Sequence, residues 1–173
     1  AEDVLARVAS ARTAGRRVVL VCLGAAATGD DAVVGWRGRR SGPDGRPRGL
    51  TGRQLCHAAW AGAIDAFGAD APGDGPLLVI AVGPQRDALE GLPLAVPPNA
   101  VCAPSVPRAD VLGAGVDLFL THGGRSSFAE AMAHAAPVVV CPGDGEQLAS
   151  AQKAEWLGVG AWVDRPDPDA GLE

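Results

Sequence analysis

Four short, continuous apolar runs constrain the fold of this chain more than any other feature. They cover residues 17–23, 77–82, 116–121 and 137–141. Runs of this length without polar alternation are typical of strands buried on both faces of a parallel sheet. Helical patterns lie between and after them, at 51–67, 126–134 and 146–157, with a short helical turn at 107–112. This alternation predicts an α/β fold, a doubly wound, Rossmann-like parallel sheet.

Composition narrows the possible functions. The 173 residues suit one domain, and 47% hydrophobic residues allow a sizeable core. The net charge of −5 gives no support to nucleic-acid binding or to a basic membrane-surface protein. No run reaches the roughly 18 apolar residues of a transmembrane helix.

The charged residues near the N-terminus and the spacing of the cysteines bear on where in the cell the protein is found. The first ten residues carry three charged side chains, which excludes a signal peptide there, and the missing initiator Met indicates an excerpt of a longer chain. The four cysteines have no CxxC spacing, so we expect free thiols in a reducing compartment and a cytoplasmic protein.

Residues 28–52 interrupt the alternation. The segment is rich in Gly, Pro and Arg, with five arginines, and is predicted to be a long irregular loop. An acidic partner could bind these arginines, but a solvated insertion is the simpler interpretation.

The most informative stretch follows the third run. His122, Gly123 and Gly124 form a turn between a strand and a helix that carries Ser126 and Ser127 in its first turn. Ligands of open α/β sheets bind beyond the carboxyl ends of the strands, and a helix N-terminus there offers N–H groups to an anion. We therefore expect a phosphate site.

Polar groups around this site suggest a nucleotide sugar. Glu130 lies one turn farther along the same helix and could accept two hydrogen bonds from a vicinal diol such as a ribose. The loop after the fourth run, residues 142–147, carries Asp144, Glu146 and Gln147, which suit sugar hydroxyls, although Glu146 and Gln147 could instead cap a helix.

Other motifs of this fold class are missing from the sequence. It contains no GxxxxGK[ST], no GxGxxG after a strand and no GxSxG. Its three His and four Cys have no metal-ligand spacing. We therefore expect no metal and no cofactor, with the nucleotide diphosphate sugar as a co-substrate.

The spaced residues resemble the donor-binding, C-terminal domain of family 1 (UDP-glycosyltransferase-like) glycosyltransferases of the two-domain B-type fold. The pattern is HGG-x-x-S-x-x-E, then P, then P-x-x-x-[DE]-Q. Its matches are His122, Gly123, Gly124, Ser127, Glu130, Pro137, Pro142, Glu146 and Gln147. Residues 99–112, with Val106 and Arg108, resemble the family's base-binding segment, and 157–163 also fit.

The resemblance implies a role for each position. His122 and Ser127 would hold the diphosphate, Glu130 the ribose, and Glu146 and Gln147 the donor sugar. The sequence departs from the family at four places: Ser105 replaces a base-stacking Trp, Arg108 a Gln, Ala25 a Ser or Thr, and Ser150 an Asn.

The resemblance also implies a division of labour. Residues 1–163 would form the donor domain, with 28–52 as an insertion and 164–173 as an acidic tail. The donor domain would serve transfer of a hexosyl group from a UDP-sugar to a small hydroxyl acceptor. The family's general base lies on an acceptor domain that this sequence lacks, so we expect no activity from this half alone and an acceptor domain supplied in cis or in trans. The alternative is a non-catalytic nucleotide-binding module or a donor subunit.

Aromatic residues outside the motif have simpler interpretations. His57 and His134 are expected at the surface or in packing roles. Trp60, Trp156 and Trp162 lie among apolar residues and are expected in the core, whereas Trp36 is expected to pack locally within its loop.

Overall fold

The computed structural model describes residues 2–41, 44–143 and 145–163, and its centre is a six-stranded parallel sheet. The order across the sheet is β5-β4-β1-β6-β7-β8. The bounds are Val18–Cys22 (β1), Leu77–Ala81 (β4), Ala100–Ala103 (β5), Leu118–Thr121 (β6), Val138–Val140 (β7) and Gly160–Trp162 (β8). The predicted doubly wound parallel sheet is confirmed, and all four apolar runs are strands.

Six helices lie in the described ranges. They are α1 (Glu2–Thr13), α2 (Gly24–Thr28), α3 (Gly52–Phe67), α4 (Arg108–Gly113), α5 (Arg125–Ala133) and α6 (Gly145–Trp156). The N-terminus of α3 carries a capping box: the Thr51 hydroxyl accepts from the Gln54 N–H at 3.1 Å, and the Gln54 side chain accepts from the Thr51 N–H at 2.9 Å.

Each face of the sheet has its own apolar core. On one face, residues of α1, α4, α5 and α6 pack against alternate strand residues such as Leu20, Val79 and Phe119. On the other face, α2 and α3 pack against Val21 and Ile80. Burial on both faces explains why the strands are continuous apolar runs.

The described residues of the 28–52 segment are mostly irregular, with the short paired strands β2 (Arg40–Ser41) and β3 (Pro47–Arg48). The segment is nevertheless tied to the core through Trp36, which is 1% exposed and packs near the rings of Trp60 and His57. The Trp36 N–H donates to the Gly29 carbonyl at 2.7 Å, and the Trp36 carbonyl accepts from the Arg53 N–H at 2.9 Å. This loop therefore contributes to the second core.

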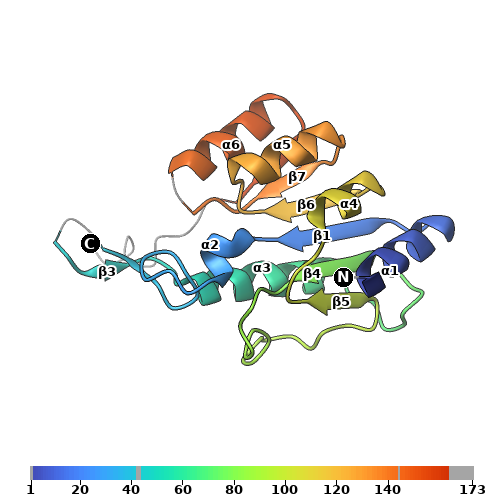
Figure 1. The fold of residues 1–173 in the computed structure, drawn as a ribbon, viewed down its shortest axis with the longest axis horizontal. Helices are drawn as coiled ribbons and strands as arrows, with labels where there is room; N and C mark the ends of the chain where they lie inside the picture. Colours follow the sequence, from blue (N-terminus) through green and yellow to red (C-terminus); the bar gives the residue numbers. More distant parts are fainter. Residues whose placement is uncertain (1, 42–43, 144, 164–173) are drawn as a thin grey trace.

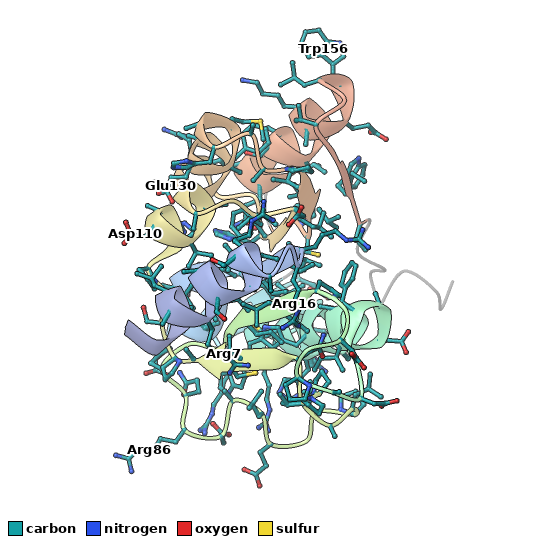
Figure 2. The ribbon with its side chains drawn as sticks, turned by 90° about the vertical axis from the view of Figure 1, so that its right-hand side faces the viewer. Arg7, Arg16, Arg86, Asp110, Glu130 and Trp156 are labelled. Carbon is teal, nitrogen blue, oxygen red and sulfur yellow. The ribbon has the colours of Figure 1, made fainter. Side chains whose placement is uncertain are left out.

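The other three tryptophans differ in how far they are buried. Trp60 is fully buried, as expected, and Trp162 is half-buried against the first core. The expectation for Trp156 was wrong: it ends α6, is 83% exposed, and points away from the molecule in Figure 2.

Asn99 holds the linker after α3 in place. It is completely buried; its side-chain oxygen accepts from the Ala69 N–H, and its amide donates to the carbonyls of Phe67 and Pro76, each at 2.8 Å. The acidic tail, 164–173, lies outside the described residues. Within the ranges described, no helix has the length and apolar character that crossing a bilayer requires.

The strand register brings the carboxyl ends to one edge of the sheet. Cys22 pairs with Ala81 on one side and with Thr121 on the other, and Thr121 pairs with Val140. In Figure 1 the strand arrows point to the side where α2 and the 28–52 segment lie. Because the chain order reverses between β1 and β6, these two strands define the switch point where α/β sheets bind ligands.

Candidate functional site

His122 lies at the switch point and is held between two glycines. It follows β6 directly, and Gly24 follows the neighbouring β1 by two residues. A Cβ on Gly24 would lie 2.5 Å from His122 Cε1, and a Cβ on Gly124 would overlap His122 Nε2. Gly24 also has a φ of +78°. The imidazole therefore fits only because both positions lack a side chain.

Gly24 is a site residue that the sequence analysis missed. Only Ala25, beside it, was noted there as a departure from the family pattern. A glycine soon after a buried strand, at the carboxyl edge of a parallel sheet, is the signal that could have identified it.

Gly123 and Gly124 shape the start of α5. Gly123 has a φ of +82°, and a Cβ there would lie 2.5 Å from Val140 Cγ1 on the adjacent strand. Gly124 is the N-cap of α5 and has no side chain to cap the helix. The N–H groups of the first turn of α5 therefore receive no cap from it, which suits an anion.

A cavity of about 90 Å³ lies between this turn and the 28–52 segment. His122, Gly143 and Gln147 form part of its wall, and the rest is mainly apolar, including Leu23, Val33, Val34, Leu50 and Leu55. The structure thus brings the predicted phosphate residue His122 and the predicted sugar residue Gln147 to one cavity.

The two predicted sugar-binding side chains are placed differently. The Gln147 side-chain oxygen accepts from the Gly143 N–H at 2.6 Å, which fixes the side chain at the start of α6. Glu146 does not line the cavity; its carboxylate is exposed and accepts from Arg125 at 3.2 Å. An exposed pair of this kind contributes little to stability.

Arg108 binds two residues that were predicted to contact the nucleotide. Its Nε and Nη2 each donate to one oxygen of Glu130 at 2.7 Å, and its Nη1 donates to Ser127 Oγ at 2.8 Å. The Arg108 and Glu130 side chains are 24% and 32% exposed, and Ser127 is buried. Figure 2 shows Glu130 on the side of the molecule, at α5.

This contact sets the charge of the pair. Hydrogen bonds from Arg108 hold the pKa of Glu130 below its usual value, against the opposite effect of partial burial. Hydrogen bonds to Glu130 correspondingly raise the pKa of Arg108. Both groups are therefore ionised at neutral pH.

The remaining predicted residues lie around this arrangement. Val106 is half-buried and packs against the first core, while Ser105, at the position of the family's Trp, is exposed. His57 is half-buried, and its Nε2 lies 2.8 Å from the Ala88 carbonyl, whereas His134 is exposed at the end of α5. In the part of the chain that the structure describes, no group of three His, Cys, Asp or Glu is placed to hold a metal ion.

Comparison with known proteins identifies the segment that carries this site. Residues 89–165 match the model of the family described as UDP-glucoronosyl and UDP-glucosyl transferase. Over this segment the chain is similar to that family. It contains β5 to β8 and therefore every predicted binding residue.

Curated relatives extend the similarity. The chain is 37% identical over 109 residues to the uncharacterized UDP-glucosyltransferase YdhE of Bacillus subtilis. That alignment covers 63% of this chain but only 26% of YdhE, so the chain spans about a quarter of the relative's length.

Solved structures show the same fold. The glycotransferase of kitacinnamycin matches 86% of this chain and 30% of its own, with a TM-score of 0.59 and 24% identity. Os79 from O. sativa, solved in complex with UDP, matches 86% of this chain and 27% of its own, with a TM-score of 0.51 and 20% identity. The family 1 glycosyltransferase resemblance and the Rossmann-like half of the B-type fold are thereby confirmed.

Proposed function

We propose that this chain is the donor-binding part of a glycosyltransferase and binds a nucleotide diphosphate sugar, with UDP as the nucleotide. The observation that carries the proposal is the His122 ring held by Gly24 and Gly124 at the switch point, beside the N-terminus of α5 and the cavity that Gln147 lines. The relatives' names and the UDP complex of Os79 support UDP as the nucleotide.

The diphosphate would lie at the first turn of α5. Backbone N–H groups there and the His122 imidazole would donate hydrogen bonds to its oxygens, and Ser127 can donate its hydroxyl hydrogen while its oxygen accepts from Arg108. During transfer the glycosidic C–O bond breaks and its electron pair remains on the diphosphate. Donors that are already in position stabilise this developing charge without reorganising.

The sugar would enter the cavity beside Gln147. Val34 and Leu55 would form an apolar wall on one side of the sugar, and its hydroxyls would meet the polar wall at Gln147. The acceptor hydroxyl would lose its proton to a general base, which we assign to an acceptor domain contributed in cis or in trans, with a small molecule as the acceptor. The 173-residue chain alone should therefore transfer no hexosyl group, and turnover by it with any hydroxyl acceptor would contradict this assignment.

The binding step can be tested by calorimetric titration of the chain with UDP. Removing a hydrogen bond to a charged group costs about 1.5–3 kcal/mol, so His122→Ala, which leaves no side-chain donor, should raise the Kd for UDP by roughly tenfold or more. Uridine, which carries no phosphate, should lose much less affinity.

The matched control is His134→Ala, because His134 is exposed at the far end of α5. His57 is unsuitable as a control because its ring lies near Trp36 and Trp60 in the second core. Equal Kd values for UDP in the parent, His122→Ala and His134→Ala would refute the diphosphate site.

A further inference from the structure

The Glu130 carboxylate already has a partner. A guanidinium occupies one lone pair on each of its oxygens in a bidentate pair, with both N···O distances at 2.7 Å. A vicinal diol that binds both oxygens at once would need the same two lone pairs, because the second lone pair on each oxygen points outward, away from the other oxygen. The diol and Arg108 therefore compete for the same two atoms.

The position of Arg108 suggests what could displace it. The residue begins α4 after Pro107, and its Nη1 reaches Ser127 in the first turn of α5. The guanidinium thus lies beside the helix end where the proposed diphosphate would bind. Phosphate oxygens match the planar fork of a guanidinium as well as a carboxylate does, and a diphosphate carries more charge.

We propose that Arg108 is a specificity-determining residue that closes Glu130 to the ribose until a diphosphate draws the guanidinium away. In the free protein Arg108 is paired with Glu130 and Ser127. When a diphosphate binds, Arg108 turns to its oxygens, and the released Glu130 accepts the two ribose hydroxyls. Nucleosides without phosphate are thereby bound more weakly. This inference rests on the proposed function, because it requires that diphosphate and ribose use the same site.

The proposal makes the two halves of the ligand cooperative. If inorganic pyrophosphate opens the site, it must raise the affinity for uridine, and uridine must raise the affinity for pyrophosphate by the same factor. In a protein where Arg108 only braces α4 against α5, pyrophosphate would leave uridine binding unchanged.

The test is calorimetric titration of the 173-residue chain with uridine, with and without saturating pyrophosphate. We expect pyrophosphate to increase uridine affinity at least about fivefold in the parent, the lower end of typical coupling between sites. In Arg108→Gln, uridine should bind better than to the parent, and pyrophosphate should add nothing.

A second variant identifies the group that is released. Adding Glu130→Gln to Arg108→Gln should abolish the gain in uridine affinity, because the freed carboxylate is then gone. Thermal melting of each variant checks that it is folded. If Arg108→Gln unfolds, Arg108→Lys takes its place: it keeps the charge but lacks the planar fork of the guanidinium, and it should show a cooperativity between pyrophosphate and uridine that is intermediate.

The possible results separate the two proposals. If the parent binds UDP in a His122-dependent way but pyrophosphate fails to improve uridine binding, the role of Arg108 is overturned and the donor site stands. If UDP binding is absent or independent of His122, the donor site itself fails and this inference fails with it.

Discussion

A glycine-to-alanine change at Gly24 should have two separate effects: it should displace the His122 ring, and it should strain the backbone at position 24. An alanine Cβ there would lie 2.5 Å from His122 Cε1, whereas real Cβ contacts are essentially never under 3.0 Å and ordinary ones begin at 3.4 Å. The ring must therefore move by at least about 0.5 Å, and by about 1 Å to reach ordinary contact. Such a displacement is enough to break a hydrogen bond from the ring, because these bonds weaken steeply outside their narrow range of distance and angle.

The stability cost of Gly24→Ala has a separate origin. With φ at +78°, an alanine at this position costs about 1–2 kcal/mol of folding free energy. Gly15 is the matched control, because its φ is +69° and a Cβ there meets nothing within 4 Å. Both variants should lose similar stability in urea denaturation from this strain, with any extra loss in Gly24→Ala due to the displaced ring.

The affinities should differ. Gly24→Ala should raise the Kd for UDP roughly ten- to hundredfold, the equivalent of a hydrogen bond to a charged group, while Gly15→Ala should leave it unchanged. Gly124→Ala should also weaken UDP binding, without this backbone cost because its φ is −57°, and Gly73→Ala, whose Cβ meets nothing, is its control. If Gly24→Ala binds UDP as tightly as Gly15→Ala, the ring between the two glycines is not holding the diphosphate.

Three further outcomes are expected. Trp36→Ala should reduce the free energy of unfolding, measured in urea, by about 3–5 kcal/mol, because this buried ring joins the 28–52 segment to the second core. The same change should make residues 28–52 the first site of limited proteolysis. Unchanged protection of the segment in hydrogen exchange would contradict this expectation. Asn99→Ala should cost at least about 2 kcal/mol, because it leaves the Ala69 N–H and the carbonyls of Phe67 and Pro76 without this partner, and a midpoint equal to the parent's would show that water replaces it. The Glu130–Arg108 pair should make the free energy of unfolding depend on pH in the acidic range. Because the pKa of folded Glu130 lies below its ordinary value of 4.5, the stability that the pair adds is complete above about pH 4.5 and is lost as the pH falls through the folded pKa. The difference in stability between the parent and Glu130→Gln should therefore shrink only in that range.

The core strands and the site turn could be predicted because their signals are local. Continuous apolar runs mark strands buried on both faces, and the capping box at Thr51 lies within four residues. β5 and β8 were missed because they are short edge strands containing Ala, Cys and Gly. α1 was missed although Val4, Val8 and Ala11 have helical spacing.

The parts that sequence reasoning could not supply depend on contacts between distant elements. The pairing of Arg108 with Glu130 joins α4 to α5, and no spacing rule predicts that a guanidinium will lie on that carboxylate. Trp156 shows the converse: its apolar neighbours suggested burial, but the end of α6 carries it beyond the sheet. Trp36 is buried because its loop folds back over α3, and the Gly- and Arg-rich sequence around it gives no sign of this burial.

The place of β1 in the sheet bears on how the chain folds as it is synthesised. β1 is synthesised before both of its neighbours: Val19 pairs with Leu78 on one side and with Leu118, 99 positions along the chain, on the other. Until β6 has left the ribosome, one edge of the most central strand must stay unpaired. Such distant pairings slow folding and leave unpaired strand edges prone to association. A nascent chain that stops between β4 and β6 should therefore be the form that most needs a chaperone.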